Sequence, residues 1–156
     1  MRQGHEFLLR VYYEDTDTGG IVFYANYLKF FERARTEWLR AGSAEAAGVS
    51  QQQIADELGL MFVVRSTAVE YKRPARLDDR IVIVSRIERL GRVGVDFYQE
   101  ALLDVPGHAA SGKDARELLA IGRIKVACVA RGSLRPAAIP ETIRTIFGAT
   151  PASRMP

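Results

Sequence analysis

One apolar helical pattern, set among five strand patterns, constrains the fold of this chain most. Apolar residues recur at steps of three and four over residues 27–41, so they share one face of a helix. These residues are Tyr27, Phe30, Phe31, Ala34, Trp38 and Ala41. We predict a helix there, with Asn26 as its N-cap and Gly42 as its stop. A stripe that carries four aromatic side chains should be deeply embedded in a core.

The strand patterns predict the layer that covers this helix. Residues 7–14 are β-branched and aromatic with partial alternation, and residues 60–72, 80–90, 93–104 and 117–130 also predict strands. A sheet of about five long antiparallel strands curls around a single apolar helix, which gives an α+β fold. This architecture leaves one face and one edge of the sheet uncovered, and such surfaces are usually covered by a partner. We therefore expect a homodimer or a homotetramer.

The remaining segments are connections. The run SQQQIADELG at residues 50–59 favours a short helix closed by Gly59, and the Gly- and Ala-rich residues 104–116 favour a mobile hairpin loop. Residues 132–156 contain several prolines and predict a short helical turn followed by a loose tail. A chain of 156 residues suits one hydrophobic core, so we treat residues 1–156 as a single domain.

Composition and charge argue against several classes of function. The net charge of +3 comes from basic residues spread along the chain, whereas nucleic acid binding needs a basic cluster or stripe. No apolar run approaches the roughly 20 residues needed to span a bilayer, and residues 1–10 lack a secretory signal pattern. Cys128 is the only cysteine and lies in an apolar run, which predicts a buried structural thiol. Together these features favour a cytoplasmic protein.

Two carboxylates in a glycine-bearing loop are the strongest chemical signal. Asp15 and Asp17 lie just before the predicted helix, whose N-terminus presents unpaired backbone N–H groups. Such donors can hold the oxyanion that develops on a carbonyl, while a nearby carboxylate activates water or attacks the carbon itself. Gly19 and Gly20 would let backbone or substrate approach closely. The same residues are also typical of an ordinary turn or helix cap, so the spacing alone leaves both interpretations open.

The spacing of Asp15 and Asp17 also raises the question of a metal site. No further His, Asp or Glu cluster accompanies the pair, because Glu14, Glu32 and Glu37 fall on different elements or faces. We therefore expect no metal.

A resemblance to a known family favours the catalytic interpretation of the loop. The run YYEDTDTGGIV at residues 12–22, followed by NYLKFFERART at residues 26–36, resembles the signature of the 4-hydroxybenzoyl-CoA thioesterase class of hot-dog proteins. It is especially similar to the Tol-Pal-associated acyl-CoA thioesterases, and the resemblance continues through residues 62–79 and 123–129. It implies a hot-dog fold, in which an antiparallel sheet wraps around one long central helix, and an enzyme that hydrolyses acyl-CoA.

The resemblance also implies roles for single residues. The second Asp of the family's pair is its catalytic carboxylate and corresponds to Asp17, and the oxyanion donor corresponds to the backbone N–H of Tyr24. The Tol-Pal-associated branch commonly has His where this chain has Tyr24, whereas the benzoyl-CoA branch commonly has an aromatic residue there. Asp15 is then structural, with hydrogen bonds to the loop backbone.

The substrate that the resemblance implies brings phosphates of its own. Coenzyme A carries a ribose phosphate and a pyrophosphate, which Arg or Lys bind. The candidates are Arg73, Arg89, Arg92 and Arg131, since such cations come from strand ends and loops in this family, often from both subunits. Coenzyme A is part of the substrate, so we expect no separate cofactor.

We therefore predict hydrolysis of a short-chain or aromatic acyl-CoA to the free acid and CoA. A hot-dog hydroxyacyl dehydratase is a second interpretation, but it needs a His paired with an acid. His5 lies near the terminus and His108 in the Gly- and Ala-rich loop, which are poor contexts for that role. A third interpretation is a partner of an acyl carrier protein, or an acyl-chain-binding protein, with little or no turnover. A basic surface would suit an acidic carrier.

Overall fold

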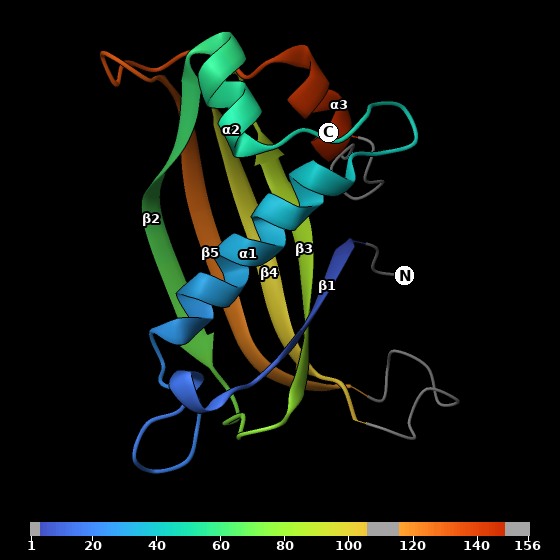
Figure 1. Cartoon of the computed structure of the whole chain (residues 1–156), viewed down its shortest axis with the longest axis vertical. Coiled ribbons are helices and arrows are strands. Elements are labelled where there is room, and N and C mark those ends of the chain that lie inside the picture. The colour runs from blue at the N-terminus through green and yellow to red at the C-terminus, as the bar shows by residue number, and fades with distance from the viewer. Residues whose placement is uncertain (1–3, 106–115, 149–156) are drawn as a thin grey trace.

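A curved antiparallel sheet wraps around one long helix in the computed structural model, which describes residues 4–105 and 116–148 (Figure 1). The five strands are β1 His5–Arg10, β2 Leu60–Tyr71, β3 Arg80–Leu90, β4 Gly94–Leu103 and β5 Glu117–Ala130. The helices are α1 Asn26–Ala41, α2 Gln51–Gln53, which continues as a π-helix over Ile54–Leu58, and α3 Glu141–Gly148. A 3₁₀ turn over Tyr13–Asp15 precedes α1. The predicted α+β architecture, a sheet of five strands around one long helix, is confirmed.

The strands do not follow one another across the sheet. Their order is β1-β3-β4-β5-β2, with all neighbours antiparallel. β2 therefore lies at the edge opposite β1, and residues 72–79 carry the chain from that edge back to β3 (Figure 1). On the way they pass the loop at residues 15–23, here called the acid loop. Val22 N–H donates to Ala75 O at 2.8 Å, so the crossing is joined to that loop.

The apolar stripe of α1 packs into the concave face of the sheet. Phe30, Phe31 and Ala34 are each at most 1% exposed. Phe31 lies directly against Gly122 of β5, where a Cβ atom would stand 2.6 Å from the ring. Gly122 therefore lets the helix approach the sheet closely. Burying each phenylalanine side chain stabilises the fold by about 2 kcal/mol.

The predicted stripe is confirmed except at its end. Ala41 is exposed, whereas Leu39, which the pattern did not include, is 4% exposed. The physical reason is that the chain folds back after the helix, where Val49 N–H donates to Leu39 O at 2.9 Å. This returning segment covers the side of α1 that carries Leu39.

Two predicted helix ends are confirmed and the predicted N-cap is wrong. Gly42 ends α1 with φ 71°, and Gly59 ends the helical stretch before β2 with φ 65°. Ala25 occupies the N-cap position of α1, with no side-chain cap. Asn26 lies inside the helix, 8% exposed, and its Nδ2 donates to the Asp15 carbonyl at 2.8 Å. The residue predicted as a cap therefore ties the helix to the acid loop.

The C-terminal segment is better packed than its composition suggested. Residues 141–148 form α3, whose Ile143, Ile146 and Phe147 are each at most 2% exposed. The predicted helical turn is therefore confirmed, whereas the burial of these side chains shows that the chain is not loose as far as residue 148. Residues 149–156 lie outside the described residues.

Two further expectations concern strand ends and loops. The first strand was expected over residues 7–14, but β1 spans His5–Arg10, because the chain turns over Tyr13–Asp15. Residues 106–115, where a mobile hairpin loop was predicted, lie outside the described residues. Among the residues described, no helix combines the length and the apolarity needed to cross a membrane.

Candidate active site

The acid loop is folded back on itself in front of α1. Asp17 N–H donates to Ile21 O and Phe23 N–H donates to Asp15 O, both at 2.9 Å. The Asp15 carbonyl also accepts from Asn26, so the loop is fixed to the first turn of the helix. Figure 1 shows the loop at the lower end of α1. This local scaffold positions both carboxylates.

The Asp17 carboxylate is held at one oxygen and free at the other. Oδ1 accepts from Gly19 N–H at 2.8 Å and from Ile21 N–H at 3.4 Å. Oδ2 has no hydrogen-bond partner among the described residues, and the side chain is exposed. A Cβ atom at Gly19 would lie 3.2 Å from Oδ1, and Gly20 has φ 85°, which favours glycine. Both glycines thus shape the turn that presents Asp17, and their contact with substrate stays a prediction.

Asp15 has the structural role predicted for it. Its Oδ2 accepts from Tyr12 N–H at 2.9 Å, while its carbonyl accepts from Phe23 and Asn26. These bonds all lie within the scaffold of the loop and the helix start. Asp15 therefore shapes the loop, and Asp17 is the more exposed of the two carboxylates.

The start of α1 presents an unused backbone donor beside the loop. Phe23 N–H and Asn26 N–H are bonded to backbone carbonyls, whereas Tyr24 N–H has no acceptor in the part of the chain that the structure describes. The Tyr24 carbonyl accepts from the Tyr71 hydroxyl at 2.9 Å, which fixes the orientation of this turn. A free N–H at the positive end of a helix dipole is suited to bind an oxyanion.

A pocket of about 280 Å³ opens beside the helix start. Its lining comes from the acid loop, α1, the end of β2 and the segment after it: Ile21, Val22, Tyr24, Tyr27, Tyr71, Lys72, Arg73 and Pro74. The tyrosine rings meet edge to face, with centroids 6.1 Å apart for Tyr24 and Tyr71 and 5.6 Å apart for Tyr27 and Tyr71. Three tyrosine side chains and two cationic side chains, Lys72 and Arg73, thus line the same pocket.

Tyr27 and Tyr71 of this pocket are neutral near physiological pH. Burial, and next the neighbouring Tyr71, raise the pKa of Tyr27 to about 12. Burial, and next Tyr24, raise the pKa of Tyr71 above its ordinary value. These two phenols therefore offer hydrogen bonds and flat apolar surface rather than a base.

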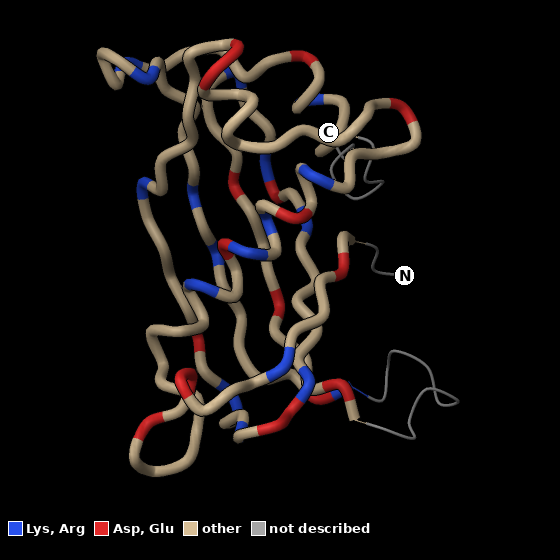
Figure 2. Tube along the Cα trace, viewed as in Figure 1, with Lys and Arg blue, Asp and Glu red and all other residues tan. Residues whose placement is uncertain are grey.

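The four arginines predicted to bind phosphates are divided between two ends of the sheet. Arg73 lines the pocket, and its ion pair with Glu117 is long, 3.8 Å, and exposed. Arg89 lies near the end of β3, and Arg92 and Arg131 follow the ends of β3 and β5. These strand ends are opposite to the end of β3 that pairs with Arg10 of β1. Figure 2 shows Lys and Arg at both ends. Within one chain the structure brings Arg73 alone of the four to the loop, and the other three would need a second subunit.

The sequence assigned no contact to several residues that line the pocket. Tyr71 and Lys72 lie just before the PARLDD turn, whose resemblance to the family was visible. Their place beside the acid loop could not be read, because it depends on β2 lying at the far edge of the sheet. Tyr27 was predicted as a core residue, and it is one, with the pocket on its exposed side.

The remaining reactive side chains lie elsewhere. His5 belongs to β1 and stacks on Trp38 of α1, with ring centroids 5.7 Å apart. His108 lies outside the described residues. Cys128 is a buried free thiol whose pKa is raised by burial, which confirms the structural role predicted for it. Among residues 4–105 and 116–148, no group of three or more His, Cys, Asp or Glu is arranged to hold a metal ion.

Comparisons with known proteins point to one family. Residues 19–106 match the model of the thioesterase superfamily. The acyl-CoA thioesterase YbgC of Haemophilus influenzae is 36% identical over 144 residues, which cover 92% of this chain and 94% of that protein. The acyl-CoA thioester hydrolase YbgC of Escherichia coli is 36% identical over 139 residues, 89% of this chain and 92% of that protein. The crystal structure of a probable thioesterase from Bartonella henselae superposes with a TM-score of 0.70 and 31% identity, covering 88% of this chain and 99% of that one.

Proposed function

The chain belongs to the thioesterase superfamily, and we propose that it hydrolyses the thioester of a short-chain or aromatic acyl-CoA at the acid loop. The resemblance to the Tol-Pal-associated acyl-CoA thioesterases and the predicted hot-dog fold are both confirmed. The family match begins two residues after Asp17, so the role of that residue rests on geometry. The observation that carries the proposal is the free Oδ2 of Asp17, in a loop that is hydrogen-bonded to the helix start where Tyr24 N–H is unpaired.

In the proposed reaction the thioester carbonyl lies against the start of α1. Its oxygen accepts from Tyr24 N–H, which stabilises the negative charge that forms as the carbonyl carbon becomes tetrahedral. Asp17 either takes a proton from a water whose oxygen bonds to that carbon, or bonds to the carbon itself and forms an anhydride that water then cleaves. In both routes the C–S bond breaks, and the CoA thiolate leaves and takes up a proton.

The pocket supports a compact acyl group. Tyrosine rings and Pro74 form its apolar part, and such rings stack favourably on a flat aromatic or short aliphatic group. Lys72 and Arg73 are exposed at the same pocket and offer cations for the phosphates of CoA. Coenzyme A comes with the substrate, and the reaction needs no separate cofactor.

The open edge of the sheet supports a homodimer, or a tetramer built from one. β2 is twelve residues long and has a single strand neighbour within the described residues. Val64 and Tyr71 on it are 51% and 47% exposed, and Tyr24 beside it is 63% exposed. Long exposed edges with apolar side chains are normally covered. A second copy along β2 would cover these side chains and narrow the mouth of the site.

Thiol release from short, long and aromatic acyl-CoAs tests the proposal, with wild type and Asp17→Asn compared side by side. Loss of a catalytic carboxylate should lower kcat by about 100-fold or more on at least one good substrate. Glu14→Gln is the matched control, because Glu14 is an exposed acid next to the same loop and should leave kcat within about twofold.

The outcomes separate the proposal from its main alternative. An Asp17→Asn protein that stays folded and oligomeric and turns over as fast as wild type would overturn the role of Asp17. Absence of thiol release from every substrate, together with binding of an acyl carrier protein that Asp17→Asn does not alter, would favour a carrier partner with little turnover. The basic residues Lys72 and Arg73 would then meet the acidic carrier. A cytoplasmic location stays a prediction.

A further inference from the structure

A row of hydrogen-bonded polar side chains, Arg35, Gln99 and Ser85, runs from α1 into the sheet, away from the acid loop. Arg35 of α1 donates through Nη1 to Gln99 Oε1 of β4 at 3.0 Å. Gln99 is fully buried, and its Nε2 donates to the Phe31 carbonyl at 3.0 Å and to Ser85 Oγ at 2.8 Å. Because both amide hydrogens are committed, the amide oxygen has to face Arg35. The guanidinium is therefore held in a fixed position, 5.6 Å from the centre of the Phe97 ring.

Among the described residues the partly buried Arg35 makes no ion pair, and Glu32 acts on it through its charge alone. In the described part of the chain Gln99 is its one hydrogen-bond partner, and no carboxylate lies within ion-pair distance. Arg40, one turn further along the same helix, pairs with Glu37 at 2.6 Å. Burial lowers the pKa of Arg35 to about 10, so it is still a cation at neutral pH. Burying a charge without a counterion is costly, which calls for a reason to keep it.

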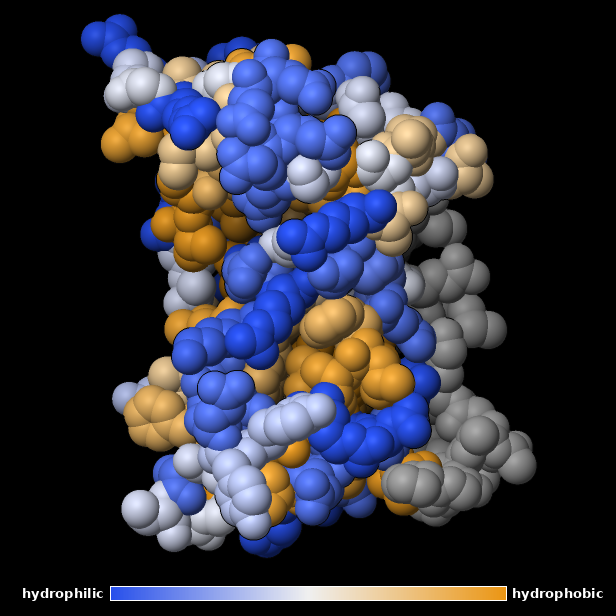
Figure 3. Space-filling model, in the orientation of Figure 1, coloured by the Kyte–Doolittle hydropathy of each residue, from blue (hydrophilic) through white to orange (hydrophobic). Residues whose placement is uncertain are grey.

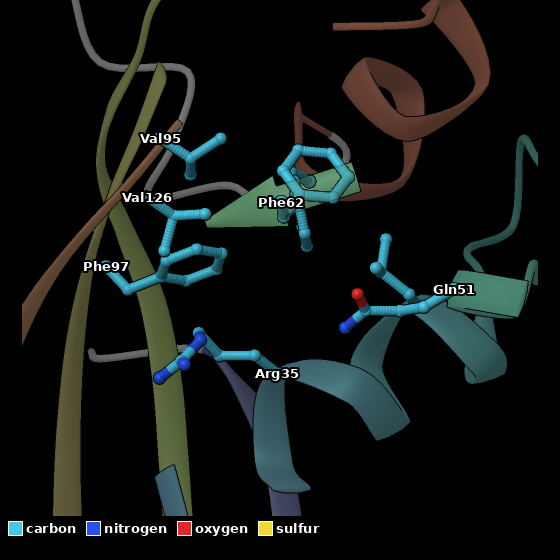
Figure 4. A pocket seen from close by; sticks show the side chains of 8 residues that line it. Arg35, Gln51, Phe62, Val95, Phe97 and Val126 are labelled. Carbon is cyan, nitrogen blue, oxygen red and sulfur yellow. The ribbon is translucent and has the colours of Figure 1, made fainter. Parts of the chain in front are cut away.

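Arg35 lines a small cavity of about 30 Å³. Its lining comes from α1, α2, α3 and three strands of the sheet: Arg35, Leu39, Gln51, Phe62, Val95, Phe97, Val126 and Phe147. In Figure 4 the Gln51 amide points into the hollow from the α2 side, and the Arg35 side chain runs along the opposite side toward Phe97. A space of this volume holds about two water molecules, which is also the room that the two oxygens of a carboxylate take up.

This cavity and the tyrosine pocket are both lined by residues of α1 and β2, and we call the surface between them the seam. Tyr24 and Tyr71 line the pocket at one end, and Arg35 and Phe62 line the cavity at the other. Leu28 lies seven residues before Arg35 on α1, so these two share a face of the helix, and Tyr24 lies just before the helix begins. The helix packs closest against β1 and β3, which leaves the β2 side less covered.

The middle of the seam is apolar and open. Leu28 is 39% exposed, and Val64, on the same face of β2 as Phe62, is 51% exposed. Figure 3 shows apolar surface over β2 between α1 and α2. Nine residues separate Asn26 from Arg35, and at the helical rise this is about 14 Å, the length of a medium to long acyl chain.

We propose that the cavity receives the far end of an acyl chain and that Arg35 selects chains that end in a carboxylate. The proposal rests on the proposed function and adds a second substrate class to it, the CoA thioesters of dicarboxylic acids. A chain too long for the tyrosine pocket lies along the seam over Leu28 and Val64. Its carboxylate replaces the water in the cavity and accepts from the planar fork of the guanidinium, which Gln99 holds in place.

The test compares matched substrates that differ only at the far end of the chain. kcat/KM is measured for dodecanedioyl-CoA and dodecanoyl-CoA, with butyryl-CoA as a reference that does not reach Arg35. Wild type should prefer the dicarboxylic thioester by about tenfold or more, which corresponds to about 1.4 kcal/mol. Arg35→Met should abolish this preference and leave butyryl-CoA turnover within about twofold. Arg35→Lys should retain part of the preference, since it keeps the charge without the fork.

Arg40→Met is the matched control, because Arg40 is exposed and already paired on the same helix, and it should keep the wild-type preference. Equal rates on the two long thioesters in wild type would overturn the proposal and mean that the cavity holds water alone. A preference that survives in Arg35→Met, or a loss of all substrates alike, would also overturn it. If Arg35→Met does not fold, the wild-type comparison and Arg35→Lys decide. Failure of the proposed function looks different, because then no thioester, butyryl-CoA included, releases thiol.

Discussion

The acid loop and the small cavity each hold a charged side chain, Asp17 and Arg35, and they hold it in opposite ways. Asp17 is exposed and held by backbone N–H groups two and four residues away, at Gly19 and Ile21. Arg35 is largely withdrawn from water and held by Gln99, which is 64 residues away in the sequence. A group held by its own loop can change without disturbing the core. A group held by a distant buried side chain is coupled to the fold, so its environment and the stability of the protein change together.

Gln99→Leu tests most directly whether the environment of Arg35 is coupled to the stability of the fold, and we expect it to have the largest effect on stability. It leaves Arg35 without its acceptor, and Ser85 and the Phe31 carbonyl without their donor, all inside the core. Loss of such partners should lower the free energy of unfolding by about 3 kcal/mol. The measurement is urea unfolding, with thiol release from a short acyl-CoA assayed on the folded fraction.

Gln51→Leu is the matched control, because it makes the same replacement at an exposed glutamine that lines the same cavity. Its effect on unfolding should stay within about 0.5 kcal/mol. If Gln99→Leu is as stable as wild type, the hydrogen bonds of Gln99 do not couple the environment of Arg35 to the stability of the fold. If it slows a short acyl-CoA as strongly as Asp17→Asn, the two ends are not separate in function.

The same contrast explains what the sequence could predict. The helix pattern and the YYEDTDTGGIV run are local, and the helix, the acid loop and the structural role of Asp15 were all predicted from them. The place of β2 beside β5 is not local, and neither the pocket residues Tyr71 and Lys72 nor the Arg35–Gln99 pair was foreseen. Charge spacing along one helix cannot reveal a partner that arrives on a strand 64 residues later.

The C-terminal segment shows that the sequence also failed to predict which residues pack into the core. Its prolines suggested little structure, yet Ile143, Ile146 and Phe147 recur at helical spacing and enter the core. Phe147 also lines the cavity under Arg35. The far end of the seam is therefore assembled from three helices and three strands, whereas the acid-loop end is assembled from two short stretches of chain, residues 21–27 and 71–74.

Tyr71→Phe tests whether the acid-loop end depends on one contact from a distant strand, and we expect an intermediate effect. The change removes the hydroxyl that donates to the Tyr24 carbonyl at 2.9 Å and keeps the ring in the pocket. The turn that carries Tyr24 N–H should then be held less firmly. We expect kcat/KM to fall about fivefold, which corresponds to the net worth of one hydrogen bond, about 1 kcal/mol.

Tyr13→Phe is the control for this change, because the Tyr13 side chain lies before the same loop and is 81% exposed. It should leave kcat/KM within about twofold. Equal rates for Tyr71→Phe and wild type would show that the loop holds the helix start unaided. The position of Tyr24 N–H would then depend on the acid loop and α1 alone, without a contribution from β2.

The smallest expected effect concerns pH and stability at the other half of α1. His5 of β1 stacks on Trp38 with 6° between the ring planes, and its Nδ1 is buried without a hydrogen-bond partner in the described residues. Burial lowers the pKa of His5 from the ordinary value of 6.5, against the opposing charges of Glu37 and Glu6. The folded protein thus favours neutral His5, and the unfolded chain binds its proton at higher pH.

The sign of the effect follows from this difference. The stability that neutral His5 contributes is fully present above pH 6.5, and it is lost as the pH falls from there through the lower pKa of the folded state. His5→Phe keeps a ring on Trp38 and removes the titration, so urea unfolding of both proteins from pH 7.5 down to about 5 isolates the contribution of His5. Wild type should lose more stability than His5→Phe over that range, while the ratio of their kcat values stays constant, because the acid loop lies at the other end of the helix. A stability difference that does not change with pH would mean that His5 titrates alike in both states and that its stacking on Trp38, rather than its charge, is what the core requires.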